Sequence, residues 1–416
     1  MDSISSWLEV RALRGAWTIG QIHPARLKLP AVIVLVAGLM FLPGCSSSTM
    51  VLPDGWTMLS DDGADFAEDT ADSFDAGVDL ADDGDGSKDL QLPDTAMSDT
   101  GFDEPQAAFN RDFFALAKSI IDASTSRVHV IEYVLYNSGS SGTLIRAIAD
   151  AADRGVEVKV LADEAGDSST QEALNFLDGR GVITKLDSPN VTTHNKLIIA
   201  DDKTIVGSTN FTTNAISYNN EASVLISDPR VTAYYESFFQ ALWLNSEQDP
   251  VLSKADTYPV TPIKNRELVG YLESCLLGAG KQVRLVLYAA CYSAGYSDEE
   301  SDYNRLLTRI IEAQERGVDV KVILDHSDWI VSNQINNDAV AYLLAAGVDV
   351  SFAPSSVVTH AKALRCDDTV LITDENWCYS GLHEYNGTSA QITTQNMVDA
   401  YDAWFLNIWN QSTPAL

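Results

Sequence analysis

The sequence predicts an α/β protein of two similar lobes, each with a mixed β-sheet covered by helices. Apolar stretches of period two alternate with stretches whose apolar residues have helical spacing, which is the pattern of such folds. The order then repeats, and GVEVKVLAD at 155–163 returns as GVDVKVILD at 317–325. With 416 residues, 45% of them hydrophobic, the chain can form two cores.

In the first half, each element follows from its pattern and from the glycine that ends it, such as Gly155 after a predicted helix. His129 falls early in its strand, so we expect a structural rather than a catalytic role for it. The expected order is a helix at 109–123, a strand at 128–136, a helix at 142–154, a strand at 156–161, a helix at 169–177, a short strand after 181, a hairpin at 193–210, a strand at 222–226 and a helix at 229–243.

The second half repeats this order after a joint at 245–264 that is rich in Pro, Ser and Asp. We therefore expect the first lobe at 107–247, with its motif at 188–215, and the second at 265–412, with its motif at 354–381. The expected elements are a helix at 268–277, a strand at 283–290, a helix at 303–316, a strand at 318–324, a helix at 339–346 and a hairpin at 359–376.

The two hairpins carry the candidate catalytic residues. THNKLIIADDKTIVGSTN at 193–210 and THAKALRCDDTVLITDEN at 359–376 share the pattern His-x-Lys-x4-Asp. The period of a strand places His and Lys on one face. The return strand brings further polar residues back towards the same end. The candidates are His194, Lys196, Asp201, Ser208 and Asn210 in the first copy and His360, Lys362, Asp367, Asp374 and Asn376 in the second.

An imidazole and an ammonium that point at one spot suit an attack on phosphorus. The neutral imidazole supplies the nucleophile, and the lysine neutralises charge on the phosphoryl oxygens. A phosphodiester is cleaved in two displacements if a second imidazole protonates the leaving oxygen. One hairpin cannot place two imidazoles on opposite sides of a phosphate, so we expect the two lobes to face each other.

The double motif resembles that of the phospholipase D superfamily, from about residue 107 to residue 409. The resemblance implies a duplicated fold with a pseudo-twofold axis, an active site at the lobe interface, and no metal or cofactor. It implies that His194 is the nucleophile and His360 the general acid and then base. Phosphate oxygens would be bound by Lys196, Lys362, Asn210 and Asn376. Ser208 is either a further phosphate donor or a local backbone cap.

Asp201 and Asp367 belong to the motif, but their spacing puts them several residues from the phosphate, so we expect them to support the fold and the charge balance of the site. A catalytic histidine also needs an acceptor that fixes its tautomer. Glu221, in an Asn-x-Glu element at 219–221, is the candidate for His194. The second half has Gly387 at the matching place, and Glu384 is a candidate substitute.

The N-terminal region predicts export. Residues 29–42, LPAVIVLVAGLMFL, form a 14-residue apolar run, which suits a secretory signal. The following LPGC resembles a lipoprotein signal, so we expect a signal peptide at 1–44 and lipid on Cys45; an uncleaved anchor is the alternative. Residues 45–106 are expected to be a disordered acidic linker, with 17 acids against one lysine over 54–106. We expect the protein on a bacterial outer membrane or cell surface.

The net charge and the cysteines reduce the number of function classes that fit this sequence. A formal net charge of −32 argues against a broad nucleic-acid surface. The other four cysteines, all in the second half, predict two disulfides with three possible pairings, or else free buried thiols. The first hypothesis is a monomeric, lipid-anchored phosphodiesterase that hydrolyses phospholipids or transfers their phosphatidyl group. The alternatives are a nuclease of the same superfamily and a non-catalytic phospholipid- or phosphate-binding lipoprotein.

Overall fold

The computed structural model describes residues 103–164, 167–255 and 257–415. The predicted signal peptide, Cys45 and the acidic linker up to residue 102 lie outside the described residues. In the part of the chain that is described, no helix is both long enough and apolar enough to span a bilayer.

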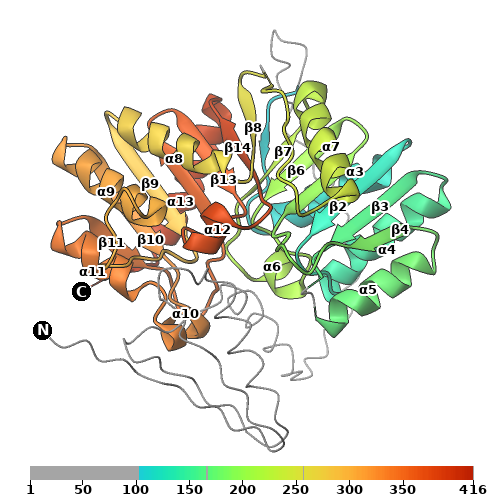
Figure 1. The fold of residues 1–416 in the computed structure, drawn as a ribbon, viewed down its shortest axis with the longest axis horizontal. Helices are drawn as coiled ribbons and strands as arrows, with labels where there is room; N and C mark the ends of the chain where they lie inside the picture. The colour runs from blue at the N-terminus through green and yellow to red at the C-terminus, as the bar shows by residue number, and fades with distance from the viewer. Residues whose placement is uncertain (1–102, 165–166, 256, 416) are drawn as a thin grey trace, which may run out of the picture. The chain divides into compact units, whose positions relative to one another are not determined.

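The first lobe is built on a seven-stranded sheet with the order β1-β7-β6-β5-β2-β3-β4 (Figure 1). Strands β2, β3 and β4 run parallel, and the remaining neighbours pair antiparallel. The strands are β1 (Gln106–Ala107), β2 (Arg127–Glu132), β3 (Glu157–Ala162), β4 (Ile183–Leu186), β5 (Lys196–Ala200), β6 (Lys203–Gly207) and β7 (Ser223–Ile226). The helices are α3 (Asp112–Ala123), α4 (Gly139–Asp153), α5 (Ser168–Asp178), α6 (Thr213–Ser217) and α7 (Pro229–Leu244).

The second lobe has an eight-stranded sheet with the order β15-β11-β10-β9-β12-β13-β14-β8. Its strands are β8 (Val260–Lys264), β9 (Gln282–Leu287), β10 (Asp319–Leu324), β11 (Asp349–Phe352), β12 (Lys362–Cys366), β13 (Thr369–Thr373), β14 (Thr388–Ile392) and β15 (Thr413–Pro414). Its helices are α8 (Glu267–Gly278), α9 (Asp302–Glu315), α10 (Asp328–Asn333), α11 (Asn337–Ala345), α12 (Tyr379–His383) and α13 (Gln395–Trp409).

Seven strands of each sheet share one order and one set of directions, so the chain is a duplicated α/β fold, as predicted. The central hairpin of each lobe is β5–β6 or β12–β13, and each hairpin contains a His-x-Lys motif at its start. The short helices α6 and α12, which were not expected, follow these hairpins at matching places.

The lobe boundaries differ from those predicted. Gln106, expected in the linker, lies in β1 and pairs with Leu225 of β7. Strand β8 lies within the expected joint at 245–264, and Pro262 is tolerated there because β8 is an edge strand. Strand β15 pairs with β11 beyond the expected end at 412.

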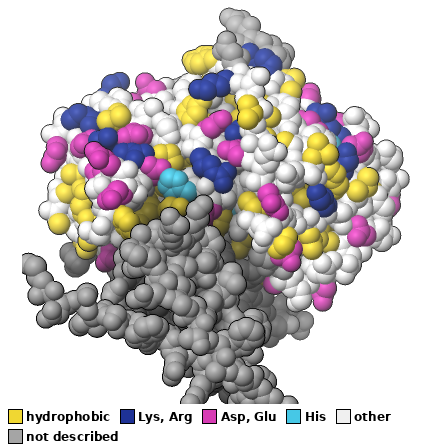
Figure 2. All heavy atoms as spheres, viewed as in Figure 1, with side chains coloured by type: hydrophobic (Ala, Val, Ile, Leu, Met, Phe, Trp, Pro, Cys, Tyr) yellow, Lys and Arg dark blue, Asp and Glu magenta, His cyan; other side chains and the backbone are white. Residues whose placement is uncertain are grey.

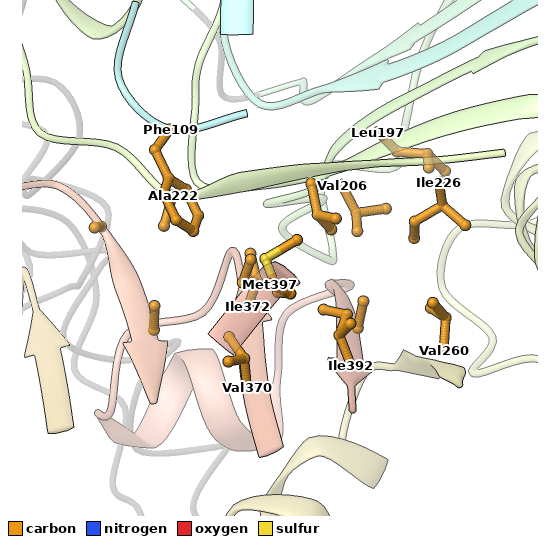
Figure 3. Packing of buried hydrophobic residues seen from close by; sticks show 14 of the residues in the cluster. Phe109, Leu197, Val206, Ala222, Ile226, Val260, Val370, Ile372, Ile392 and Met397 are labelled. Atoms are coloured by element: carbon orange, nitrogen blue, oxygen red, sulfur yellow. The ribbon is translucent and has the colours of Figure 1, made fainter. Parts of the chain in front are cut away.

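The two lobes share a hydrophobic core between their sheets. One cluster of buried side chains includes Val206 of β6, Phe238 of α7, Ile372 of β13 and Tyr401 of α13. Figure 3 shows labelled side chains of the first lobe pointing toward those of the second. Two further clusters fill the space between each sheet and its outer helices. Burial of apolar surface across this interface stabilises the arrangement of the two motifs, at about 25 cal/mol per Å² removed from water.

Candidate active site

Each motif histidine lies two residues before the lysine that begins the first strand of its hairpin, β5 or β12. His194 and Lys196 are 1% and 3% exposed, and His360 and Lys362 are both fully buried. The predicted pairs are therefore located inside the protein, in extended backbone where the period of two puts both side chains on one face.

Backbone pairing between the lobes holds both motifs. The N–H of His194 donates to the carbonyl of Asn386 at 3.0 Å, and the N–H of Asn220 donates to the carbonyl of Val358 at 2.8 Å. Bridges Thr193–Asn386 and Asn220–Thr359 are therefore equivalent under the duplication. The segment after each short helix contacts the residues just before or at the histidine of the other lobe, so the two motifs meet at the lobe interface.

A carboxylate from the opposite lobe lies beside each histidine. Both oxygens of Glu221 are 3.2 Å from Nδ1 of His360, and Oε2 of Glu375 is 3.5 Å from Nδ1 of His194. All four side chains are buried. A carboxylate at Nδ1 favours the tautomer that has its proton there, which leaves the lone pair of Nε2 for chemistry.

These contacts correct the predicted carboxylate assignment. Glu221, expected to orient His194, contacts His360 instead. Glu384, the suggested substitute in the second half, is exposed, whereas Glu375 lies at the site. The sequence did contain a signal for Glu375, because it lies between Asp374 and Asn376, two residues already singled out.

Ser208 supports Glu221. Its hydroxyl donates to Oε2 of Glu221 and accepts from the N–H of Ala222 at 2.9 Å, and Nδ2 of Asn219 lies 3.3 Å from the other oxygen of Glu221. The hydroxyl proton of Ser208 is thus used within the protein. Ser208 therefore does not donate to phosphate in this geometry, as one of the two predicted roles required. Its proton instead orients the carboxylate beside His360.

Asn210 and Asn376 directly follow the hairpins at matching positions and are buried. Within the described residues, the Oδ1 atom of neither side chain has a hydrogen-bond partner. A buried polar atom without a protein partner calls for an explanation, and a polar ligand is one. Each Oδ1 is thus suited to a ligand group that donates a hydrogen bond, whereas binding of phosphate oxygens would fall to Nδ2 and stays a prediction.

Each lysine packs on a tyrosine that the sequence analysis missed. Nζ of Lys196 lies 5.1 Å from the ring centre of Tyr133, and Nζ of Lys362 lies 5.1 Å from that of Tyr288. These rings also contact His194 and His360 edge-on, with centroids 5.0 and 4.8 Å apart. Both tyrosines directly follow equivalent strands, β2 and β9, so a comparison of the repeats contains the signal that finds them.

The two lysines differ in their polar contacts. Nζ of Lys196 donates to the carbonyl of His194 at 2.9 Å, whereas Nζ of Lys362 lies 2.6 Å from Nε2 of His360. An ammonium can only donate, so Nε2 of His360 accepts and its proton is on Nδ1, which faces Glu221. This is the tautomer that the carboxylate favours.

Two further acids lie near Lys196, and neither has an acid at the equivalent position of the other lobe. Glu132, which pairs with Lys196 in the β2–β5 register, corresponds to Leu287 in the second lobe. Burial raises the pKa of Glu132 well above its usual value, against a lowering by Lys196. Burial likewise raises the pKa of Asp374 to about 7, although Lys196 and the hydrogen bonds from Thr388 oppose the shift. Both pKa shifts favour the neutral acid and so reduce the negative charge around Lys196.

A second pair of aspartates anchors the segments that lead into the motifs. Oδ2 of Asp163 accepts from the N–H of Thr193 at 2.6 Å, and Oδ1 of Asp325 accepts from the N–H of Thr359 at 2.6 Å. These residues end the repeated sequences GVEVKVLAD and GVDVKVILD, which explains why both repeats close with aspartate.

The motif aspartates lie away from the histidines. Asp201 is at the turn of the β5–β6 hairpin, seven residues after His194, which is about 23 Å of extended chain. Its carboxylate accepts the N–H groups of residues 125–127, and that of Asp367 accepts those of residues 280–282. Asp201 and Asp367 therefore do not belong with the catalytic residues, although they are part of the motif. Their expected support of the fold is confirmed.

Two other expectations are answered by the structure. Disulfides join Cys275 to Cys366 and Cys291 to Cys378. His129 is buried, with its two ring nitrogens 2.9 Å from Glu236 and 3.1 Å from Glu157, so it has a structural role, as predicted. Among the described residues, no group of three or more His, Cys, Asp or Glu is placed to hold a metal ion. Metal independence itself stays a prediction.

Two facing α/β lobes with a His and Lys pair from each at their interface define a member of the phospholipase D superfamily. The chain belongs to the family described as "Cardiolipin synthase, PLD-like domain", which matches residues 117–243 and 272–409. One matched segment falls within each lobe.

Individual relatives are distant. The chain is 23% identical over 124 residues to a mitochondrial cardiolipin hydrolase of Chlamydomonas reinhardtii, a match that covers 30% of this chain and 54% of that protein. It is 32% identical over 117 residues to a phospholipase D of Rickettsia bellii (strain RML369-C), covering 28% and 56%. The chain thus spans about half the length of the curated relatives it matches. A phosphatidylserine synthase structure from Haemophilus influenzae Rd KW20 has a similar fold, with a TM-score of 0.60 at 12% identity over 75% of this chain and 87% of that one.

Proposed function

We propose that this protein is a phosphodiesterase that acts on phospholipids through a phosphohistidine intermediate. The observation that supports this most directly is the pairing of each motif histidine with a buried carboxylate of the opposite lobe and with a lysine of its own strand. The relatives named above, a cardiolipin hydrolase and a phospholipase D, support phospholipid-modifying activity as the class.

In the first step, Nε2 of His194 attacks phosphorus and the bond to the leaving alkoxide oxygen breaks. His360 in its protonated form gives a proton to that oxygen, and Glu221 stabilises the imidazolium before the transfer. Lys196 and Lys362 neutralise charge on the phosphoryl oxygens. An anionic phosphate draws the ammonium of Lys362 away from Nε2 of His360, which it contacts at 2.6 Å without substrate, and Nε2 then takes up from solvent the proton that it gives to the leaving oxygen.

In the second step, His360 accepts a proton from water as the water oxygen attacks phosphorus, and the bond to His194 breaks. The phosphate monoester leaves and both histidines return to their first state. An alcohol in place of water gives transfer of the phosphatidyl group instead. The order of roles, with His194 first, follows the resemblance to the superfamily and is part of the proposal.

Phospholipid rather than nucleic acid is the proposed substrate class. The chain has a formal net charge of −32. On the face shown in Figure 2, basic and acidic side chains alternate without a broad basic surface. A polyanion gains affinity mainly from such a surface, whereas a single lipid phosphate needs only the local lysines.

We also propose that the protein is exported and lipid-anchored at Cys45. The two disulfides support export, because such bonds persist in oxidising compartments, whereas the anchor rests on the LPGC sequence. Export would place the enzyme at a bilayer that contains its substrate.

The test uses the full-length protein with vesicles of phosphatidylcholine or cardiolipin and, separately, plasmid DNA, all in excess chelator. Release of choline or phosphatidate with intact DNA is expected. Cleaved DNA with intact lipid would indicate that the protein is a nuclease. Vesicle binding without turnover under any condition would indicate a non-catalytic phospholipid-binding protein.

The chemical step needs its own variant. His194→Asn should abolish turnover and remove the acid-labile phosphoryl group that rapid quenching traps on the wild-type protein. His383→Asn is the matched control, because His383 is a third exposed on α12 and pairs with Asp302 rather than with the site. Full turnover in His194→Asn would refute the assigned nucleophile.

A further inference from the structure

The two lobes carry the carboxylate that serves the opposite histidine at different positions of the repeat. The separation of 166 residues that joins His194 to His360 also joins Lys196 to Lys362 and Asn210 to Asn376. The same separation joins Glu221 to Gly387, and Thr209 to Glu375. The second lobe therefore lacks an acid where the first lobe has one, and has an acid where the first lobe has threonine.

The carboxylate of Glu375 occupies the space that a side chain at 387 would need. A methyl group on Gly387 would lie 2.1 Å from Oε1 of Glu375 and 2.8 Å from Oδ1 of Asp374. Gly387 is not among the glycines with a left-handed φ, so its backbone does not require glycine. The surrounding side chains require it.

A second glycine makes room for the same group. Gly381 of α12 corresponds to Ala215 of α6 at the same separation of 166 residues. A methyl group on Gly381 would lie 3.1 Å from Oε2 of Glu375 and 2.6 Å from the carbonyl oxygen of Asn376. Four differences between the lobes, at 374, 375, 381 and 387, are thus parts of one local rearrangement.

The rearrangement preserves the contact with the histidine. Glu375 approaches Nδ1 of His194 to 3.5 Å, as Glu221 approaches Nδ1 of His360 to 3.2 Å. The two acids reach the same kind of position from different backbone points, since Glu221 lies after α6 and Glu375 lies before α12. Each is buried in the lobe opposite the histidine it contacts.

We infer that Glu375 is the positioning residue of His194, a carboxylate relocated within the second lobe from position 387 to position 375. Its catalytic consequence rests on the proposed function, whereas its effect on the tautomer of His194 does not. The relocation predicts that an acid at 387 can replace the acid at 375, provided that the side chains at 374 and 375 no longer fill the space.

Four variants of the full-length chain test this. Glu375→Gln removes the charge and keeps the shape, and Glu375→Thr reproduces the residue of the first lobe. Gly387→Glu alone puts two side chains into one space. The triple variant Asp374→Ser, Glu375→Thr and Gly387→Glu reproduces the first-lobe residues at all three positions, because Asp374 would also lie too close to a side chain at 387. The matched control is Glu384→Gln, which removes one negative charge from an exposed residue next to α12.

We expect Glu375→Gln and Glu375→Thr to lower kcat by about 100-fold or more with little change in KM, because a misoriented imidazole costs turnover rather than binding. Gly387→Glu alone should be inactive or unstable. The triple variant should recover to within about tenfold of wild type, which a purely structural role of Glu375 does not predict. A folded triple variant as inactive as Glu375→Thr would overturn the inference, as would full activity of Glu375→Gln.

A second measurement does not depend on turnover. In protein labelled with 15N-histidine, the ring nitrogen shifts report which nitrogen carries the proton, and His194→Asn identifies the signals of His194. Glu375→Gln should move the His194 proton towards Nε2, and Glu384→Gln should not. Unchanged shifts in Glu375→Gln would refute the assignment. If wild-type protein lacks turnover but these shifts change as expected, the positioning role stands and the proposed function fails.

Discussion

Nδ1 of His360 in the second lobe lies 3.2 Å from both carboxylate oxygens of Glu221 in the first lobe. The hydroxyl of Ser208, also in the first lobe, donates to the same carboxylate. A short chain of hydrogen bonds therefore leads from one lobe to the histidine of the other. This relationship means that neither lobe contains a complete site.

Glu221→Gln should therefore impair the step that His360 carries. An amide can still contact Nδ1 but does not stabilise an imidazolium, so we expect kcat to fall by about 100-fold or more and KM to stay near the wild-type value. Ser208→Ala should have a smaller effect in the same direction, because Asn219 still contacts Glu221. Steady-state kinetics on lipid vesicles measure both. A selective rise of KM in Glu221→Gln would instead indicate a role in substrate binding.

Asp201→Asn should reduce stability rather than chemistry. The carboxylate accepts three backbone N–H groups at 2.9 Å, and the NH2 group of asparagine would face some of these donors. Loss of charge-assisted hydrogen bonds predicts a decrease of about 2–3 kcal/mol in the free energy of unfolding. Denaturant titration checks this, and kcat at low temperature should stay within a fewfold of wild type. A folded variant without turnover would return Asp201 to the catalytic residues.

The lowered pKa of Asp201 predicts that its contribution to stability is lost in acid. Burial alone would raise the pKa of Asp201, but hydrogen bonds from Arg127, Thr125 and Ser126 lower it below its usual value. Its contribution to stability is thus present above the unfolded pKa of about 3.9 and is lost as the pH falls through the lower folded value. The deficit of Asp201→Asn relative to wild type should accordingly shrink below pH 4 in denaturant titrations. A deficit that grows on acidification would contradict this.

Asp374 predicts the opposite slope. Burial raises its pKa to about 7, against an unfolded value of about 3.9. Between these values the folded protein holds the proton and the unfolded chain does not, so the contribution of Asp374 to stability falls as the pH rises from about 4 to about 7. Asp374→Asn should remove this slope and compare more favourably with wild type at pH 8 than at pH 5. Equal differences at both values would contradict the raised pKa, because they would show that the folded and the unfolded chain hold the same number of protons at Asp374 over this range.

Reduction of the disulfides should destabilise the second lobe. Cys291 and Cys378 are 87 residues apart in sequence, and their bond joins the segment after β9 to the start of α12. A closed loop of this size predicts a loss of about 2–4 kcal/mol on reduction. Denaturant titration of wild type with and without reductant, beside a variant with Cys291→Ser and Cys378→Ser, measures it. If the free energy of unfolding of wild type does not change with reductant, the four thiols are free.

Local patterns in the sequence determined much of this protein. Period two fixed the shared face of His194 and Lys196, and the repeated segments ending at Asp163 and Asp325 indicated the duplication. These inferences succeed because the alternation of a strand is a property of neighbouring residues. The predicted strand at 128–136 was too long, since β2 ends at Glu132. Apolar residues continue beyond the strand there because Leu135 is buried in loop structure, which periodicity alone does not distinguish from a strand.

Tertiary structure alone decided which acid serves which histidine and which cysteines pair. Glu221 and His360 are 139 residues apart, and nothing local to either residue encodes their contact. The relocation of the second acid to Glu375 is likewise visible only as competition for one space with Gly387. The sequence determines the residues that a lobe presents at its edge, whereas the packing of the two sheets on a shared apolar core determines which of those residues meet.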